Sequence, residues 1–207
     1  MIFETPASVS SLERALERAT RGTTGPALVA AIVPSPVGAL VAAASDDGLC
    51  LLEFGEERRL GRQLELLTRL FGPARMGDHP VLEHTRTELT EYFEGARTRF
   101  EIPLVIRGTP FQELVWRSLL EIPYGETVAY SELAHSLGRA GAQRAVGLAN
   151  GQNRQSIIIP CHRVVEKGGG LRGYGGGLWR KRFLLDLERR VIGADPLADT
   201  PLGQAGA

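Results

Sequence analysis

The sequence predicts an α+β protein of two domains, an N-terminal antiparallel sheet with helices and a mainly helical C-terminal domain that contains a helix-turn-helix. The length of 207 residues suits two small domains better than one large domain. The first half combines strand-like runs with helical segments, whereas the second half has a different, mainly helical pattern that begins with Thr109. The composition, 43% hydrophobic and 23% charged, is that of a globular protein and excludes global disorder and fibrous designs.

The predicted domains span residues 1–103 and 104–190, and residues 191–207 are expected to be a disordered tail. Residues 1–103 hold 11 basic and 15 acidic side chains, whereas residues 104–190 hold 13 basic and 7 acidic. The positive charge therefore belongs to the second domain. Cationic surface of this kind allows a nucleic-acid partner, although a solvated basic face explains the charge equally well.

Membrane and secretory segments are not expected. The least polar stretch, residues 25–44, is interrupted by proline and glycine, and no basic segment precedes an apolar run at the start. Two cysteines, Cys50 and Cys161, cannot form a disulfide framework, and no Cys/His cluster has metal-ligand spacing. We therefore expect a reduced, cytoplasmic protein without a bound metal.

Three strand-like runs predict an antiparallel meander in the first domain, at 27–33, 39–44 and 49–54. Turn signals rich in proline, aspartate and glycine separate them. Helices and a last strand are predicted around the meander, at 12–21, 57–71, 81–93 and 100–106. No catalytic grouping is visible, and His79 and His84 are expected on the surface or at a helix cap.

The second domain begins with a helix capped by Thr109, and two short helices follow, from Thr127 to Leu137 and from Gln143 to Asn150. Two short helices joined by a glycine-containing turn are typical of a helix-turn-helix. The small residues of the last one permit close approach to DNA, but a core helix that packs through its alanines fits equally well. A final amphipathic helix is predicted at 178–190.

The candidate nucleophile is Cys161, which follows the β-branched run 157–159 and Pro160 and precedes His162. A thiolate forms more readily near a histidine, although a lone cysteine is more often a small buried hydrophobe. Neighbouring side chains diverge in extended backbone, so coupling through a water is more natural than direct contact. Glu188 could orient the histidine, or it could be an ordinary surface glutamate.

The glycine-rich segment 168–177 has seven glycines in ten positions. It lacks the closing Lys-Ser/Thr of a phosphate loop, and no G-x-G-x-x-G follows a strand, so a nucleotide cofactor is not expected. The segment instead suits a flexible wall that contacts a flat ligand through backbone groups and Tyr174.

Five sequence features follow one another in the second half. They are, in order, Arg-Ala-Val-Gly at 144–147, Asn153, Ile-Pro-Cys-His-Arg-Val at 159–164, Gly-Tyr-Gly-Gly-Gly-Leu at 173–178 and Glu188. This pattern resembles the O6-alkylguanine-DNA alkyltransferases, also called methylated-DNA–protein-cysteine methyltransferases. The match spans roughly residues 104–188, while the first half is similar only in its order of strands and helices. The resemblance implies a ribonuclease H-like N-terminal domain and a winged-helix-like C-terminal domain.

The resemblance also implies a function. Such a protein flips O6-alkylguanine, and O4-alkylthymine, out of double-stranded DNA and transfers the alkyl group irreversibly to its own Cys161. Water cannot readily cleave the resulting thioether, so one molecule repairs one lesion without metal or nucleotide cofactor. The implied partner is alkylated duplex DNA, bound through the minor groove by a monomer that can cluster along the DNA.

The implied site residues are carried over position by position. Cys161 is the alkyl acceptor, His162 activates it through water, Glu188 supports His162, and Asn153 ties down the segment before the cysteine. Tyr130 helps to rotate the nucleotide and hydrogen-bonds the guanine, and Arg144 fills the gap left by the base. DNA binding is implied for Arg144, Tyr130, Ala145 and Gly147, and the base pocket for Val164, Tyr174, Gly175 and Asn150.

One position departs from the family pattern. Arg154 stands where proline commonly follows the asparagine, which is expected to loosen this segment. We hypothesise that Arg154 contacts a DNA phosphate instead. Three rival functions remain: a non-catalytic sensor, in which tryptophan typically replaces the cysteine; a transcription regulator, which needs longer base-reading side chains; and a thiol hydrolase, for which no oxyanion hole is evident.

Overall fold

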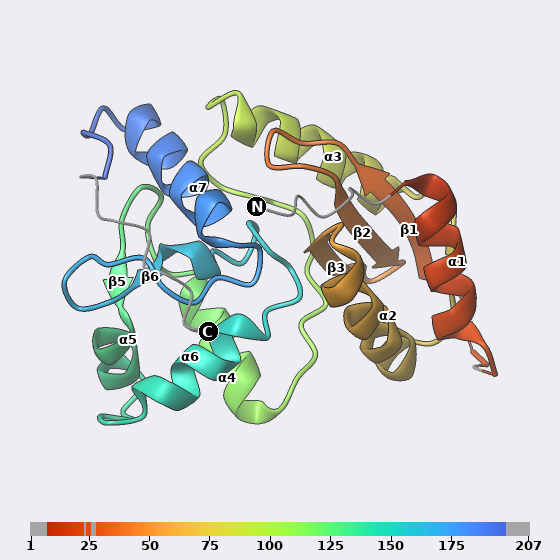
Figure 1. The fold of residues 1–207 in the computed structure, drawn as a ribbon, viewed down its shortest axis with the longest axis horizontal. Coiled ribbons are helices and arrows are strands. Elements are labelled where there is room, and N and C mark those ends of the chain that lie inside the picture. The colour runs from red at the N-terminus through yellow and green to blue at the C-terminus, as the bar shows by residue number, and fades with distance from the viewer. Residues whose placement is uncertain (1–7, 23, 26–27, 198–207) are drawn as a thin grey trace. The chain divides into compact units, whose positions relative to one another are not determined.

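The computed structural model describes residues 8–22, 24–25 and 28–197. The chain forms two compact units, residues 1–107 and residues 108–207 (Figure 1). Each unit is built around its own buried side chains.

The N-terminal unit contains a four-stranded sheet in the order β3-β2-β1-β4. The antiparallel meander predicted from the sequence is confirmed as β1 (Leu28–Val33), β2 (Leu40–Ser45) and β3 (Gly48–Phe54). A short strand that the sequence did not predict, β4 (Ala74–Met76), adds to β1 in parallel. The prediction of a strand at 100–106 is wrong, because this segment forms only one isolated β-bridge, between Leu104 and Leu49.

Helices cover both faces of this sheet. The three predicted helices are confirmed as α1 (Val9–Thr20), α2 (Glu57–Phe71) and α3 (Pro80–Phe93). Leucines of α1 and α2 share one apolar cluster with alternate residues of β1 and β2. Because α3 packs against the same strands and every residue of β3 is buried, neither face of the sheet is left open to solvent.

The two histidines of this unit have structural roles. His79 is the N-cap of α3, where its Nδ1 accepts a hydrogen bond from the Val81 amide at 3.2 Å. His84 lies 3.0 Å from the carboxylate of Glu88 on the same helix. Both placements agree with the expectation of a cap or surface position.

The C-terminal unit contains the predicted helix-turn-helix. Its first helix, α4 (Pro110–Leu119), begins at the Thr109 capping box. The next two helices, α5 (Tyr130–Ser136) and α6 (Gln143–Gly151), pack against each other. The remaining elements are β5 (Val128–Ala129), paired in parallel with β6 (Val164–Val165), the 3₁₀ turn η1 (Cys161–Arg163) and α7 (Leu178–Val191).

Two expectations for this unit need correction. Residues 157–159 form a turn rather than a strand, since Ile157 has φ of 75° and the Ile159 amide donates to the Gln155 carbonyl at 2.9 Å. The three isoleucines are buried around this turn. The segment assigned to a tail begins inside α7, and Leu197 donates a backbone hydrogen bond to Asp186 at 3.0 Å; residues 198–207 lie outside the described residues.

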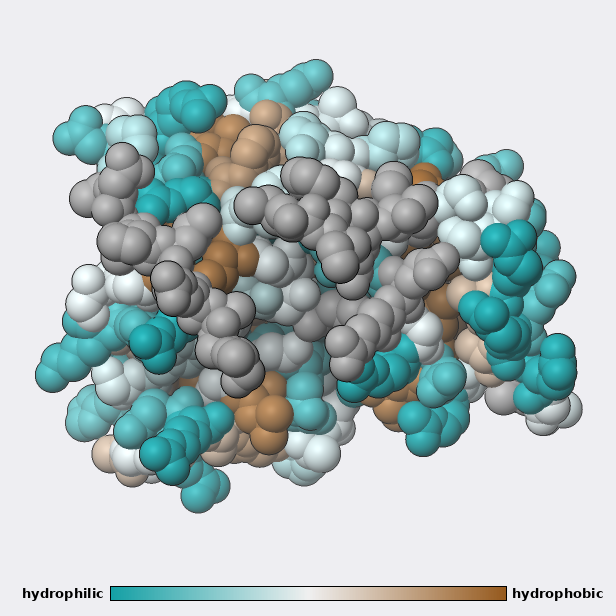
Figure 2. Space-filling model, viewed as in Figure 1, coloured by the Kyte–Doolittle hydropathy of each residue, from teal (hydrophilic) through white to brown (hydrophobic). Residues whose placement is uncertain are grey.

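Hydrophilic residues predominate on the face of the molecule in Figure 2, and apolar residues occupy separate patches. Within the described part of the chain, no helix combines the length and apolar character needed to cross a bilayer.

Candidate active site

Cys161 is held by a turn that its neighbours fix in place. It is the first residue of η1 and is 5% exposed. Its backbone carbonyl accepts a hydrogen bond from Asn150 Nδ2 at 3.3 Å. Asn153 spans the preceding turn, since its Nδ2 donates to the Ile159 carbonyl at 2.9 Å and its Oδ1 accepts from the Gln155 amide at 3.0 Å. These bonds fix the backbone on which the thiol sits.

His162 lies beside Glu188 in the interior. Its Nε2 is 2.8 Å from Glu188 Oε1, and neither side chain is exposed. Burial is the main cause that lowers the pKa of His162 below 6.5, against the opposing pull of Glu188, so the ring is neutral at pH 7. An ionised carboxylate can only accept, so Nε2 carries the hydrogen and Nδ1 is a lone-pair acceptor. This buried Nδ1 has no hydrogen-bond partner among the described residues.

Glu188 also binds Arg163, a residue that the sequence analysis did not assign to the site. The guanidinium donates to both carboxylate oxygens, from Nε at 2.9 Å and from Nη2 at 3.0 Å, and the Gly125 amide adds a bond of 3.0 Å. Burial acts to raise the pKa of Glu188, but His162 and Arg163 hold it well below 4.5. Glu188 is therefore an ionised, fully buried carboxylate and not an ordinary surface glutamate.

Tyr130, the first residue of α5, lies between two glycines. A Cβ at Gly147 would lie 3.7 Å from its ring, and one at Gly173 would lie 4.0 Å from its hydroxyl. Burial, followed by the charge of Cys161, raises the pKa of Tyr130 to about 12. Its hydroxyl is therefore protonated at neutral pH and can donate a hydrogen bond.

Lys181 is a second residue that the sequence analysis missed. It is fully buried on α7, and its Nζ donates to the Val164 carbonyl at 2.6 Å and to the Arg172 carbonyl at 3.1 Å. Burial lowers its pKa to about 8, while the charge of Cys161 acts in the opposite direction. The same ammonium lies 5.9 Å from the centre of the Tyr130 ring. Lys181 thus joins β6 to the glycine-rich segment and places a positive charge near the thiol.

We predict that Lys181→Met slows the reaction of Cys161 with iodoacetamide at pH 7. The ammonium favours the thiolate, which is the form that reacts, so its loss should reduce the rate by about tenfold, the effect of 1.4 kcal/mol. Intact-mass spectrometry over time measures the rate. Arg182→Met, on the neighbouring position of α7, is the matched control, and equal rates for both variants would contradict the prediction.

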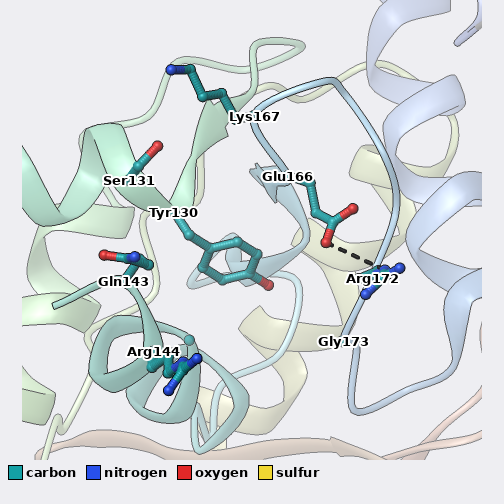
Figure 3. A pocket seen from close by; sticks show the side chains of 9 residues that line it. Tyr130, Ser131, Gln143, Arg144, Glu166, Lys167, Arg172 and Gly173 are labelled. Atoms are coloured by element: carbon teal, nitrogen blue, oxygen red, sulfur yellow. Dashed lines mark ion pairs between the residues drawn. The ribbon is translucent and has the colours of Figure 1, made fainter. Parts of the chain in front are cut away.

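A cavity of about 520 Å³ lies beside Tyr130 in this unit. Figure 3 shows the Tyr130 ring among the lining side chains, with Gln143 and Arg144 on one side and Glu166 and Arg172 on the side of its hydroxyl. The lining residues are Tyr130, Ser131, Gln143, Arg144, Gly147, Glu166, Lys167, Arg172 and Gly173.

The cavity includes only some of the residues predicted from the sequence. Tyr130, Arg144 and Gly147 line it. The predicted pocket residues do not: Val164 and Asn150 are buried, Tyr174 is partly buried and Gly175 is exposed. Cys161 is also absent from the lining. The other lining residues were not predicted, because only the folding of the loop after β6 toward α5 and α6 brings them together. They are Ser131, Gln143, Glu166, Lys167 and Arg172.

The α6 helix has one buried and one exposed face. The predicted core helix that packs through its alanines fits the buried face, and the predicted helix open to close approach by DNA fits the exposed face. Arg144 and Ala145 are exposed, whereas Val146 and Ala149 are buried. The Ala149 carbonyl accepts a hydrogen bond from the Trp116 indole at 2.8 Å, which fixes α6 against α4. One face therefore packs in the core, and the other exposes Ala145 beside the longer side chains of Arg144 and Leu148.

Arg154 does not fit the hypothesis of a phosphate contact. It is 7% exposed, and its guanidinium lies 5.1 Å from the centre of the Trp116 ring. Burial lowers its pKa. The buried arginine packs against the tryptophan that holds α6, so its contacts tie this segment to the core.

The C-terminal unit thus combines a helix-turn-helix, an element typical of DNA-binding proteins, with a buried thiol that precedes a buried histidine–carboxylate pair. Residues 28–106 match the family model "6-O-methylguanine DNA methyltransferase, ribonuclease-like domain", and residues 110–190 match "6-O-methylguanine DNA methyltransferase, DNA binding domain". The chain belongs to the 6-O-methylguanine DNA methyltransferase family, as the sequence resemblance predicted.

Comparison with individual relatives supports the same family assignment. The methylated-DNA–protein-cysteine methyltransferase of Mycobacterium bovis is 48% identical over 135 residues, which cover 64% of this chain and 82% of the relative. That of Mycolicibacterium paratuberculosis is 45% identical over 161 residues, 76% of this chain and 90% of the relative. The crystal structure of Mycobacterium tuberculosis OGT in complex with DNA has a TM-score of 0.67 and 41% identity, and it covers 82% of this chain and 96% of that one.

Proposed function

We propose that this protein repairs DNA by transferring the alkyl group of O6-alkylguanine, and of O4-alkylthymine, to Cys161. The observation that carries the proposal is the buried pair of His162 and Glu188, 2.8 Å apart, next to the cysteine in the unit that holds the helix-turn-helix. Membership of a family whose members are named for this reaction supports it.

The chemistry follows from the protonation states. The thiol proton passes through one water to His162 Nδ1, and the ionised Glu188 stabilises the resulting imidazolium. Sulfur then attacks the alkyl carbon, a carbon–sulfur bond forms, and the bond to guanine O6 breaks with its electron pair staying on the base. Tyr130 donates a hydrogen bond to the departing guanine. The product is a thioether, which water does not cleave, so each chain reacts once.

Access to the sulfur requires a movement. Cys161 is 5% exposed and does not line the cavity, whereas the adjacent Tyr130 does. We propose that Tyr130 and the segment around Gly173 shift when a base enters. Gly147 and Gly173 place no side chain against the tyrosine, where an added Cβ would contact its ring at 3.7 Å and its hydroxyl at 4.0 Å. Lys181 and Asn153 act as positioning residues for the cavity wall and the cysteine turn.

DNA is the proposed partner, bound in its minor groove by the exposed face of α6. Ala145 and Gly147 allow close approach, and Arg144 occupies the space of the extruded base. Asn150, Val164, Tyr174 and Gly175 come into contact with the base after the shift. We propose that the protein acts as a monomer that can cluster on DNA, in the cytoplasm, where thiols stay reduced.

A stoichiometry measurement tests this function. The protein is incubated with an excess of duplex DNA that contains O6-methylguanine, and methyl groups removed per chain are counted by intact-mass spectrometry and by analysis of the DNA. We expect a plateau at one methyl group per native chain and none for Cys161→Ser. Continued release beyond one methyl group per chain, or uptake by Cys161→Ser, would refute the proposal.

A further inference from the structure

The mouth of the cavity carries an excess of positive charge, of which the proposed function uses only Arg144. Of the nine lining residues three are cationic, Arg144, Lys167 and Arg172, and one is acidic, Glu166. Arg144 belongs to α6, whereas the other three belong to the loop after β6. In Figure 3, Lys167 and Arg172 lie away from Arg144, with Tyr130 between them. Cations therefore reach the mouth from two separate elements.

Glu166 is placed by the backbone of a tight turn. Its amide donates to the Gly170 carbonyl at 3.0 Å, and its carbonyl accepts from the Gly169 amide at 2.8 Å. A Cβ at position 170 would lie 2.9 Å from Glu166 Oε2, so the glycine leaves room for the carboxylate. The turn therefore directs this acidic side chain toward Arg172.

Arg172 is held by Glu166 at the solvent boundary. Its Nε lies 3.3 Å from Glu166 Oε1, and the two side chains are 74% and 44% exposed. An exposed pair of this kind contributes at most about 1 kcal/mol, because water screens it. Arg144 and Lys167 are exposed, and the described residues offer neither of them an ion pair. Among the described residues, the mouth thus holds two cations without an ion pair and a third that is weakly held.

A nucleotide that leaves the duplex keeps its two backbone phosphates outside the pocket, at the mouth. Phosphates bind guanidinium groups in a bidentate manner, and each contact with duplex DNA also releases a condensed counterion. The bidentate phosphate contact and the release of a counterion should together contribute more binding free energy than the exposed ion pair with Glu166. A phosphate should therefore displace Glu166 from Arg172, and without DNA the pair limits how freely the arginine moves.

We propose that Lys167 and Arg172 bind the phosphates that flank the extruded nucleotide, opposite Arg144, and that Arg172 leaves Glu166 when it does so. The inference rests on the proposed function, because it assumes that the cavity receives a nucleotide from duplex DNA. It assigns a binding role to the loop after β6, outside the helix-turn-helix.

The test is equilibrium binding to duplex DNA, followed by fluorescence anisotropy over a series of KCl concentrations. The duplex carries a single mismatched guanine, which is easily extruded but holds no alkyl group. Lys167→Gln should weaken binding by about threefold to tenfold and reduce the salt slope by about one. Glu166→Gln should strengthen binding by about twofold to fivefold, because it releases Arg172. Arg172→Gln should cost more in the Glu166→Gln background than in the native chain.

The matched control is Arg190→Gln, which removes an exposed arginine of the same unit that does not line the cavity. The proposal is overturned if Lys167→Gln and Arg172→Gln weaken binding no more than this control. It is also overturned if Glu166→Gln weakens binding, since the ion pair would then be part of the bound state. Because the duplex is unalkylated, these results are independent of methyl transfer; a chain that binds as expected but accepts no methyl group would refute the proposed function alone.

Discussion

Replacement of His162 by glutamine should slow methyl transfer by about 10²- to 10⁴-fold, the usual effect of losing a general base. Glutamine can still donate a hydrogen bond to Glu188, but it has no basic nitrogen in the place of Nδ1. The thiol proton then has no acceptor inside the protein. The rate of methyl uptake from O6-methylguanine duplex, measured by quenched-flow sampling and mass spectrometry, tests this expectation.

The pH dependence of the methyl-transfer rate provides a second test of the His162→Gln variant. Because burial lowers the pKa of His162 below 6.5, the native rate should stay high at neutral pH and fall only at more acidic pH, where the ring is protonated. The variant should lose this acidic limb. His135→Gln makes the same change at an exposed histidine of α5 and should leave the rate unchanged. Equal rates for the two variants would show that His162 is not the base.

Glu188→Gln should lower the free energy of unfolding by up to about 3–5 kcal/mol, because it leaves the buried Arg163 without its counterion. Urea unfolding followed by tryptophan fluorescence reports on the C-terminal unit, since Trp116 and Trp179 both lie there. Methyl transfer should also slow, because the imidazolium form of His162 loses its stabilising charge. Glu121→Gln, at an exposed position of the same unit, is the control.

The acid stability of the protein should depend on the same carboxylate. The folded-state pKa of Glu188 lies below the ordinary value of 4.5, so its pairing stabilises the fold fully above that value. This stability is lost as the pH falls further, when the carboxylate takes up a proton. In the Glu188→Gln variant the free energy of unfolding should vary less with pH below 4.5. An unchanged acid profile would contradict the assignment of the low pKa.

The sequence allowed prediction of the elements that depend on local signals. The meander and the helices follow from hydrophobic periodicity and turn residues, and the motif at 159–164 marked Cys161 and His162, with Glu188 recognised separately on the last helix. The three isoleucines before Pro160 misled the prediction, because their preference for strands yields to the buried turn in which Ile157 takes a positive φ. The strand β4 was missed because three residues that pair in parallel carry no local pattern.

The parts of the site that were missed depend on tertiary contacts. Lys181 stands in a run of basic residues on an amphipathic helix and looks like a surface residue, yet two backbone carbonyls hold it in the interior. Arg163 was passed over as part of the motif, and the structure shows it bound to both oxygens of Glu188. Arg154, expected near phosphate, is buried on Trp116. None of these placements could be derived from spacing alone.

The central claim is that the alkyl group is transferred to Cys161. The most direct measurement is peptide mapping by tandem mass spectrometry after the native protein has reacted with duplex DNA that carries isotopically labelled O6-methylguanine. The chain has two thiols, Cys50 in β3 and Cys161 in η1, so each reports on the other. We predict the label as a thioether on Cys161 alone. Label on Cys50 or on any other side chain, with Cys161 unmodified, would contradict the account.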